Sequence, residues 1–406
     1  MEINMINIAL LGFGVVGSGC AEVLTSVKDK IAAQVGDEIS IKYILDLRDF
    51  PDSPFGKLIV HDFNTILNDP EVSVVAEMMG GSHPAYDFTK ALLAAGKSVV
   101  TSNKEVVSTF GVELLTIAAE NNVRYLFEAS VGGGIPIIRP LTNDLAANEI
   151  VSIDGILNGT TNFILTKMRN EGLAFEDVLK EAQRLGYAEA NPSADVDGID
   201  AARKIAILGA MASGKLADPK KIPTEGIREV SATDTEIAKE LGYAIKLIGH
   251  YESSDNGRLS LSVAPRFVPL ITSPLAGVDD VYNGIMVHGS MLGDSMFYGK
   301  GAGKLPTASA VCADIIDAAK NPTAGDVPLR WEDAESILSA DEIKTKLCII
   351  TETDSDAEKA ATALGCLKEF YRTASVMAGV SDIPLSSDDI RSVTEANGFI
   401  KTYAVM

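Results

Sequence analysis

The glycine motif GFGVVG of residues 12–17 constrains the fold more than any other stretch of the chain. It follows an apolar run, MINIALL (5–11), and a helical pattern comes after it. In this setting Gly12 permits a tight turn, Gly14 lets the backbone approach a pyrophosphate, and Gly17 permits close packing of the helix on the strand. We therefore predict a dinucleotide site whose loop residues are Gly12, Phe13, Gly14, Val15, Val16 and Gly17.

Apolar strands alternate with helices after this motif. We expect strands at 39–45, 72–79, 97–103 and 123–130, and helices at 18–33, 84–96 and 106–121. Buried strands separated by helices are typical of a parallel, doubly wound sheet. The fold class is therefore α/β, with a Rossmann-like nucleotide-binding domain over 1–133, to which 306–330 returns through a helix at 306–320.

The pattern changes after residue 133. Strands with alternating polar and apolar residues, such as RLSLSVAPRFV (258–268), indicate a half-exposed sheet. We expect an α+β domain for substrate binding and dimerisation over 134–305. Over 336–406 the expected order is β-α-β-β-α-β, the split βαβ pattern, which predicts a separate C-terminal module.

The composition excludes several classes of protein. The net charge of −21 argues against binding nucleic acid or an anionic membrane through bulk electrostatics. No apolar run reaches about 18 residues, so we expect no membrane span. The N-terminal residues lack the basic start of a signal peptide, and the four cysteines without a CxxC pair indicate reduced thiols. We therefore expect a cytoplasmic protein.

The second strand ends in LDLRDF (45–50), the position whose side chains contact the ribose of a bound dinucleotide in this type of fold. Asp46 or Asp49 would bind the 2′-hydroxyl group of NAD, whereas Arg48 would bind the 2′-phosphate group of NADP. Both residue types are present, so the cofactor preference is open at this point. We favour NADP through Arg48, with NAD possible.

Two further segments are expected near the cofactor. TSNKE (101–105) ends an apolar strand on the side where ligands bind in such sheets, so Lys104 is expected in the site rather than in solvent. YGKGAGK (298–304) is glycine-rich and precedes a helix. Its Gly301 could approach the cofactor phosphates or only pack closely against its neighbours.

Residues 186–204, GYAEANPSADVDGIDAARK, hold the densest group of opposed charges: Glu189, Asp195, Asp200 and Lys204. Asp200 and Lys204 share one helix face, where the carboxylate can orient the lysine and tune its pKa for proton transfer. The apolar run KIAILGAM (204–211) indicates a buried helix, which argues against an ordinary surface ion pair. The several carboxylates also make a pocket for a substrate ammonium group.

Two loops leave alternatives open. In NGTTNFIL (158–165), Asn158 and Thr160 precede a helix, where they could cap it or hold a substrate carboxylate. EASVGGGIPII (128–138) joins Glu128 to a glycine run. It is either a flexible hinge or a loop whose carbonyl groups hold a hard cation together with Glu128.

In this order the motifs resemble those of the homoserine dehydrogenase family over about 1–325. The resemblance rests on GFGVVG, TSNKE, EASVGGGIPII, NGTTNFIL, GYAEANPSADVDGIDAARK and GDSMFYGKGAGKLPTASAV. It implies reversible, NAD(P)-dependent reduction of L-aspartate 4-semialdehyde to L-homoserine, a reaction of threonine and methionine biosynthesis. It also implies a homodimer or homotetramer.

The resemblance assigns roles to the charged residues. Glu189 and Asp195 would hold the substrate ammonium group, and Thr160 would lie near the substrate. Asp200 and Lys204 would sit at the reacting oxygen with Lys204 as the proton donor. Lys104 matches a second active-site lysine, and which lysine transfers the proton is open.

The same resemblance predicts a sodium site. Its ligands would be the Glu128 carboxylate and the carbonyl groups of Val131, Gly133 and Ile135. The C-terminal module would be ACT-like, but its TETDSDAEKAA (351–361) lacks the Pro and Gly of the family's effector loop. Threonine regulation and a dimer-stabilising role are therefore both open.

Two other functions compete with this reading: another NAD(P)-dependent amino-acid dehydrogenase, and a nucleotide-binding amino-acid sensor without catalysis. The presence of Lys104, Asp200 and Lys204 together favours an enzyme, because a sensor would be free to lose them.

Overall fold

The computed structural model describes residues 5–254, 258–353, 370–386, 389 and 399–406 of the chain. They divide into two compact units. The first unit comprises 1–147, 207–218 and 299–333, and the second comprises 148–206, 219–298 and 334–406. The residues expected to form a separate C-terminal module thus lie within the second unit.

The first unit contains a parallel six-stranded sheet in the order β3-β2-β1-β4-β5-β6. Its strands are β1 (Met5–Leu11), β2 (Glu38–Leu45), β3 (Ile59–Val60), β4 (Val72–Glu77), β5 (Ser98–Thr101) and β6 (Tyr125–Leu126). The order reverses between β1 and β4, which is the topological switch point where doubly wound folds bind their ligands. The predicted α/β class is confirmed.

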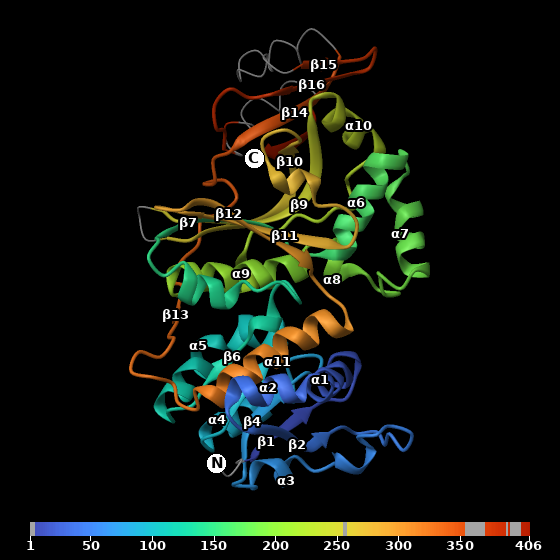
Figure 1. Ribbon diagram of the computed structural model, residues 1–406. Coiled ribbons are helices and arrows are strands. Elements are labelled where there is room, and N and C mark those ends of the chain that lie inside the picture. The colour runs from blue at the N-terminus through green and yellow to red at the C-terminus, as the bar shows by residue number, and fades with distance from the viewer. Residues whose placement is uncertain (1–4, 255–257, 354–369, 387–388, 390–398) are drawn as a thin grey trace. The chain divides into compact units, whose positions relative to one another are not determined.

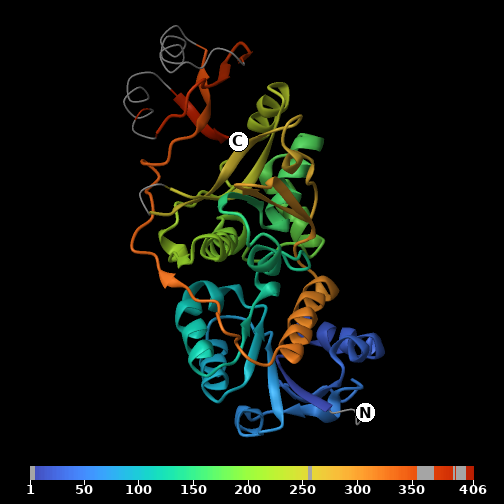
Figure 2. The same ribbon diagram turned by 60° about the vertical axis from the view of Figure 1, so that its left-hand side comes forward.

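Helices cover both faces of this sheet (Figure 1). They are α1 (Val15–Ser26), α2 (Lys28–Val35), α3 (Phe63–Leu67), α4 (Ala85–Ala94), α5 (Lys104–Glu120) and α11 (Lys304–Lys320). In Figures 1 and 2, α11 runs beside α1 although nearly 280 residues separate them in the chain. The two helices share a core of apolar side chains that includes Leu24, Val311 and Ile315. Their packing brings the 306–320 segment back to the nucleotide-binding fold.

Short elements complete the first unit. They are the 3₁₀ turns η1 (Gly56–Leu58) and η2 (Glu128–Ser130), the π-helix η3 (Pro140–Asp144), and a two-stranded ribbon of β8 (Lys215–Leu216) and β13 (Glu332–Asp333). The strand predicted over 123–130 is shorter than expected, because the chain turns into η2 at Glu128.

The second unit contains a mixed nine-stranded sheet in the order β12-β11-β7-β9-β10-β17-β14-β16-β15. Its strands are β7 (Ile150–Ile156), β9 (Tyr243–Glu252), β10 (Ser260–Pro269), β11 (Tyr282–Gly289), β12 (Gly293–Lys300), β14 (Lys346–Glu352), β15 (Phe370–Arg372), β16 (Val376–Val380) and β17 (Phe399–Val405). The C-terminal strands join the central strands where β17 pairs in parallel with β10, at Arg266↔Ala404 and Phe267↔Val405.

The helical elements of this unit are α6 (Gly159–Glu171), α7 (Phe175–Arg184), α8 (Ser193–Val196), α10 (Ala232–Glu240), η4 (Pro219–Lys221) and η5 (Pro274–Gly277), together with the start of α9 (Ile199–Ser213). The close approach of α9 to the sheet depends on Gly249, whose position would bring a Cβ atom to 3.2 Å from Ile205. Both helices expected in the C-terminal module lie outside the described residues, apart from Ser386 and Asp389.

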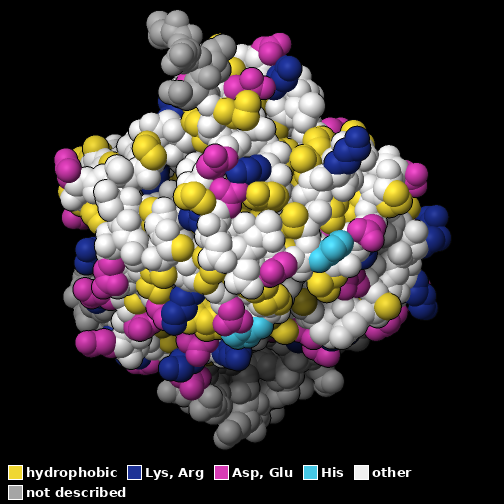
Figure 3. Space-filling model, turned by 90° about the horizontal axis from the view of Figure 1, so that it is seen from below, with side chains coloured by type: hydrophobic (Ala, Val, Ile, Leu, Met, Phe, Trp, Pro, Cys, Tyr) yellow, Lys and Arg dark blue, Asp and Glu magenta, His cyan; other side chains and the backbone are white. Residues whose placement is uncertain are grey.

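On the face seen in Figure 3, acidic and basic side chains are interspersed with apolar ones. This face offers no broad basic surface of the kind that binds nucleic acid. Among the described residues, no helix is both long and apolar enough to span a membrane.

Candidate active site

The glycine loop connects β1 to α1 at the switch point of the parallel sheet. Gly12 has φ of 90°, a conformation that favours glycine, and its N–H donates to the Leu45 carbonyl group at the end of β2. The next N–H, that of Phe13, donates to Oδ2 of Asp46 at 2.9 Å. These two bonds fix the loop against the end of β2, where a ribose would lie.

The other two glycines of the motif have different surroundings. A Cβ atom on Gly17 would lie 2.0 Å from the Gly12 carbonyl oxygen, so this position accepts only glycine if the loop keeps its shape. A Cβ atom on Gly14, by contrast, would meet no atom within 4 Å. Gly14 is the N-cap of α1, and the open space beside it is where a pyrophosphate approaches in this fold. Val15 follows it and is exposed, whereas Phe13 is buried and Val16 is half-buried.

Asp46 and Arg48 form an ion pair at the end of β2. Arg48 donates to both carboxylate oxygens of Asp46, at 3.0 and 3.2 Å. This pairing and the N–H of Phe13 lower the pKa of Asp46 to about 2. The Arg48 side chain is 65% exposed and lies over the Phe50 ring, 5.0 Å from its centroid. An acid and an arginine are therefore both present where the cofactor preference is decided.

Lys104 is the first residue of α5, directly after the end of β5. Asn103 caps this helix, since its side chain accepts from the N–H of Val106. The amide group of Asn103 also donates to the Gly81 carbonyl group at 2.8 Å, which joins the loops after β4 and β5. Lys104 is half-buried. Because it follows the carboxyl end of β5, it lies at the edge of the parallel sheet where ligands bind.

Lys204 and Asp200 form a buried pair in the second unit. Nζ of Lys204 donates to Oδ2 of Asp200 at 2.7 Å and to the Leu157 carbonyl oxygen at 2.7 Å. Lys204 is 7% exposed and Asp200 4% exposed. The helix is buried, as the apolar run predicts. A lysine held in this way by a carboxylate and a carbonyl group has its ammonium group fixed in position.

Asn158 connects this pair to a second carboxylate. Its amide nitrogen donates to Oδ1 of Asp195 at 2.7 Å and to Oδ2 of Asp200 at 2.9 Å. Its amide oxygen accepts from the N–H of Thr161 and caps α6. Of the predicted residues in this unit, the structure thus brings together Asp195, Asp200 and Lys204, and Asn158 holds the two carboxylates side by side.

Thr160 and Glu189 lie nearby in the sequence but have other contacts. The Thr160 hydroxyl group donates to the Tyr187 carbonyl oxygen at 2.7 Å, so it orders the loop before α8 and keeps only its acceptor capacity. Glu189 is exposed, and its backbone carbonyl group accepts from the Gln183 side chain at 3.1 Å. The exposed carboxylate of Glu189 lies on the surface of the unit.

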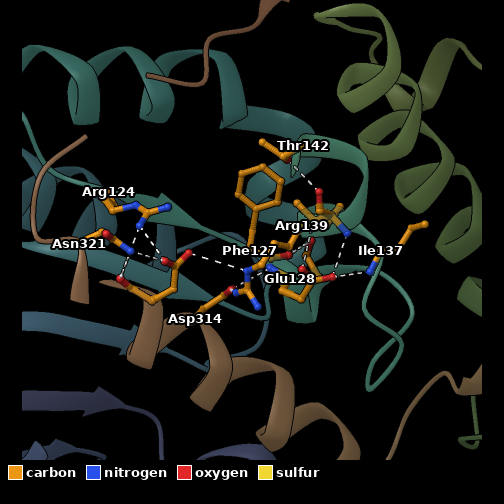
Figure 4. A network of polar contacts seen from close by, with 11 residues as sticks. Arg124, Phe127, Glu128, Ile137, Arg139, Thr142, Asp314 and Asn321 are labelled. Carbon is orange, nitrogen blue, oxygen red and sulfur yellow. Dashed lines mark hydrogen bonds and ion pairs between the residues drawn. The ribbon is translucent and has the colours of Figure 1, made fainter. Parts of the chain in front are cut away.

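Glu128 occupies the centre of a polar network in the first unit (Figure 4). Its Oε1 accepts from the N–H groups of Ile137 and Ile138, at 2.6 and 2.8 Å, and its Oε2 accepts from that of Arg139 at 2.8 Å. Glu128 is 3% exposed. Backbone N–H groups therefore surround most of this carboxylate, and Oε2 has capacity for one further partner.

The neighbouring Asp314 on α11 completes this network. Its Oδ2 accepts from the N–H of Glu128 at 2.8 Å, and its Oδ1 accepts from Arg139 at 2.6 Å. Burial raises the pKa of Asp314 to about 7, and the ion pair with Arg139 opposes that increase. The network holds the start of the glycine run against α11.

The glycine run itself is tightly curled and buried. Gly133 has φ of 55°, and a Cβ atom on it would lie 2.5 Å from the Gly301 carbonyl group. Val131 and Ile135, the other two residues predicted to supply carbonyl groups, are buried. Gly301 thus packs closely against this loop. Within the described residues, no three His, Cys, Asp or Glu side chains converge as a metal site.

Sequence reasoning missed the roles of Asn158 and Asp314. The sequence predicts that Asn158 caps a helix or holds substrate, and the cap is present, but its hydrogen bonds to two carboxylates depend on segments about 40 residues away. Asp314 carried a signal that could have been used, because it is an acid within the apolar stretch AVCADIIDAA.

Sequence profiles described as homoserine dehydrogenase and homoserine dehydrogenase, NAD binding domain, match residues 136–316 and 12–128. The homoserine dehydrogenase of Neisseria gonorrhoeae is 44% identical over 352 residues, which are 83% of this chain and 80% of that protein. A crystal structure of a homoserine dehydrogenase from Thiobacillus denitrificans superposes with a TM-score of 0.92 at 34% identity, covering 100% of this chain and 99% of the other. A hyperthermophilic archaeal homoserine dehydrogenase in complex with NADPH has a TM-score of 0.68 at 30% identity and covers 80% of this chain and 100% of its own.

Proposed function

This chain belongs to the homoserine dehydrogenase family, and we propose that its Lys204 and Asp200 carry out the proton transfer of the reaction. The reaction is the reversible, NAD(P)-dependent reduction of L-aspartate 4-semialdehyde to L-homoserine. When bound, the nicotinamide ring supplies the hydride. The single observation that supports the assignment is the buried Lys204 ammonium group held by Asp200 and the Leu157 carbonyl group.

The role of Lys204 follows from the charge that develops during reduction. As the aldehyde carbon gains a hydride, its oxygen becomes an alkoxide that needs a nearby positive charge and a proton. The Lys204 ammonium group provides both in a site with little water. Asp200 and Leu157 fix its direction, and Asn158 keeps the Asp200 carboxylate in place.

The amino-acid part of the substrate would bind beside this pair. The Asp195 carboxylate would accept a hydrogen bond from the substrate ammonium group, and Glu189 would reach the same group from the surface. Thr160 would contact the substrate through the acceptor capacity of its hydroxyl oxygen. Lys104 would act as a second positive charge at the reacting oxygen, with Lys204 as the proton donor.

The residues around the glycine loop fit a dinucleotide. The space beside Gly14 and the N–H groups at the start of α1 would take the pyrophosphate, with Gly301 close to it. We favour NADP over NAD, because the exposed guanidinium group of Arg48 is available to a 2′-phosphate group. Asp46 would still reach the ribose of NAD.

A sodium ion would bind at the glycine run. The remaining capacity of Glu128 Oε2 supports this proposal, and the carbonyl groups of Val131, Gly133 and Ile135 would supply the other oxygen ligands of a hard cation. Glu128→Gln should therefore weaken stabilisation of the protein by sodium chloride relative to potassium chloride, as measured by thermal unfolding. Equal effects of the two salts on the wild-type protein would exclude the site.

The enzyme would act as a homodimer or homotetramer in the cytoplasm. Several large apolar side chains of the second unit support association, among them Ile271, which is 96% exposed, and Met291, which is 84% exposed. Size-exclusion chromatography with light scattering measures the assembly, and a monomer at micromolar concentration would contradict it.

The function is tested by mixing purified protein with L-homoserine and either NAD or NADP, and following the absorbance of the reduced cofactor. We expect reduction with at least one cofactor and none when L-serine replaces L-homoserine. A folded protein that binds cofactor but oxidises no homoserine would favour the sensor, and oxidation of a different amino acid would favour another dehydrogenase.

A further inference from the structure

His61 follows β3 and lies beside the end of β2, at the loop to which we assign the ribose of the cofactor. The two strands pair in parallel with Leu45 across from Val60, and the N–H of Asp46 donates to the Val60 carbonyl group at 3.3 Å. Neighbouring parallel strands end at the same edge of a sheet, so His61 and Asp46 come next to each other at the edge where doubly wound folds bind their ligands. The proposed reaction gives His61 no role.

Both ring nitrogens of His61 face hydrogen-bond acceptors. Nδ1 lies 2.8 Å from the carbonyl oxygen of Asp46, and Nε2 lies 3.1 Å from Oδ1 of Asp49. A carbonyl oxygen and an ionised carboxylate only accept, and a neutral imidazole carries one N–H group, so the ring donates to both only as the imidazolium cation. The hydrogen bond to the Asp46 carbonyl group and the contact with Asp49 raise the pKa of His61, although desolvation opposes the increase. His61 therefore keeps its positive charge to a higher pH than an unperturbed histidine, whose pKa is about 6.5.

The protonation of His61 sets the balance of charge at this edge. Asp46 and Arg48 form an ion pair, and Asp49 carries a second carboxylate that is 83% exposed. The remaining charged residues from the end of β2 to the start of α3 are Asp62, which caps α3, and the exposed Asp52 and Lys57, whose charges are opposite. With His61 neutral, the carboxylates of Asp46 and Asp49 therefore face one guanidinium group, whereas with His61 charged the two signs are equal.

The two candidate cofactors differ only at the ribose that we assign to this edge. NADP carries a phosphate monoester where NAD carries a neutral hydroxyl group, and such a monoester has a charge of about −2 once the pH exceeds its second pKa of about 6. The Asp49 carboxylate alone repels this dianion, and the His61 imidazolium cancels that repulsion because it lies beside the carboxylate. Above about pH 7 the phosphate charge is constant, so any further dependence of NADP binding on pH arises in the protein.

We propose that His61, together with Arg48, determines the cofactor preference of this chain. NADP binds in preference to NAD while His61 is an imidazolium, and the preference weakens when rising pH removes the proton. This inference rests on the proposed binding of NAD(P) at the glycine loop. If His61 only held the loop in shape, its loss would weaken the binding of both cofactors alike, whereas the loss of its charge acts on NADP alone.

The test is isothermal titration calorimetry of the full chain with NADP and with NAD, at about pH 7 and about pH 9. The ratio of the two dissociation constants cancels the parts that the cofactors share. We expect the preference for NADP to fall about threefold to tenfold between these pH values, as the loss of one partly screened charge predicts. His61→Asn, which keeps a donor for the Asp46 carbonyl group, should show the lower preference at both pH values. His61→Lys, which stays charged throughout this range, should keep the higher preference at both.

His288→Asn is the matched control, because His288 is also an exposed histidine paired with an aspartate but lies in the second unit, and this variant should follow the wild type. A preference that does not change with pH in the wild type would overturn the proposal. So would the same pH dependence in His61→Asn, or an equal loss of affinity for both cofactors in that variant. Binding of neither cofactor would overturn the proposed function as well. Homoserine oxidation on the same samples separates the two: cofactor binding without oxidation would contradict the proposed reaction and leave the role of His61 intact.

Discussion

The ammonium nitrogen of Lys204 lies 2.7 Å from Oδ2 of Asp200, and both side chains are buried. The two residues are one helical turn apart, so the spacing alone places them on one face of α9. An exposed ion pair of this kind would contribute little to the stability of the fold. A buried pair, by contrast, holds the ammonium group in one direction, which is the property that proton transfer requires.

Replacing Lys204 by methionine keeps the length of the side chain and removes the ammonium group. We expect Lys204→Met to lower kcat by about 10²–10⁴-fold, because the developing alkoxide loses its proton donor. Cofactor affinity, measured by fluorescence titration, should stay within about twofold of wild type, since the glycine loop is untouched.

A second buried lysine provides the matched control. Lys246 is 1% exposed and pairs with Asp279 at 3.0 Å, also within the second unit. Lys246→Met should lower the melting temperature with a much smaller loss of kcat. If the two variants lost activity equally at a temperature where both are folded, Lys204 would have only a structural role.

Asn158 allows its two roles to be separated by one substitution. Serine is as good an N-cap as asparagine, so Asn158→Ser should keep α6 capped. It removes the amide group that bridges Asp195 and Asp200, and hydrogen bonds to charged groups contribute about 1.5–3 kcal/mol. We therefore expect a lower melting temperature, and, at a temperature where the variant is folded, a fall of kcat/KM for homoserine of about 10- to 150-fold. Wild-type kcat/KM in this variant would show that the bridge is not needed.

Local sequence signals predict most strands of the first unit closely. The glycine motif and the alternation of apolar strands with helices predict β1, β2, β4 and β5 to within about two residues, because each signal is local. The break of the first helix at Val27 was not predicted, since neither glycine nor proline marks it.

The contacts that build the site are mostly long-range, and spacing predicts only some of them. The pair of Asp200 and Lys204 could be predicted from its position on one helix. The Asn158 bridge and the N–H groups around Glu128 could not, because they depend on how distant segments fold together. The pairing of β17 with β10 is of the same kind, since strand patterns carry no information about which strands become neighbours.

Alanine at Gly14 and alanine at Gly17 should both weaken cofactor binding but should differ in their effect on stability. Gly14→Ala adds a methyl group to open space, so the melting temperature should stay within about 2 °C of wild type. Cofactor affinity should nevertheless fall at least about tenfold, because the methyl group occupies the approach of the pyrophosphate. Gly17→Ala would place its methyl group against the Gly12 carbonyl oxygen and should lower both stability and affinity. Unchanged cofactor affinity in Gly14→Ala would place the pyrophosphate elsewhere.

Arg48 tests the cofactor preference. Arg48→Ala removes the guanidinium group that would meet the 2′-phosphate group and leaves Asp46 free to face a ribose 2′-hydroxyl group. We expect KM for NADP to rise about tenfold or more, and KM for NAD to change by less than about twofold. Arg228, another exposed arginine paired with an aspartate, serves as the control in Arg228→Ala. Equal increases of both KM values in Arg48→Ala would contradict the assignment of the 2′-phosphate group to Arg48.

Glu77 gives a prediction for the dependence of stability on pH. It lies at the end of β4, fully buried, and accepts from the N–H of Met79 and the hydroxyl group of Thr101. Burial raises the pKa of Glu77 from 4.5 to about 7, and these hydrogen bonds only partly oppose the increase. Between these two pH values the folded chain keeps a proton that the unfolded chain has lost. Stability from this group is therefore present below about pH 4.5 and is lost as the pH rises to about 7.

The free energy of unfolding of the wild-type protein should accordingly contain a component that falls by roughly 3 kcal/mol between about pH 4.5 and pH 7. Glu77→Gln removes the titrating group while keeping an acceptor for the Met79 N–H, so the variant should be more stable than wild type at pH 8 and similar to it at pH 4. Glu113→Gln is the control, because Glu113 is exposed and its ion pair with Lys90 lowers its pKa. Differential scanning calorimetry across this range decides the matter: parallel curves for wild type and Glu77→Gln would mean that Glu77 is ionised in the folded protein throughout.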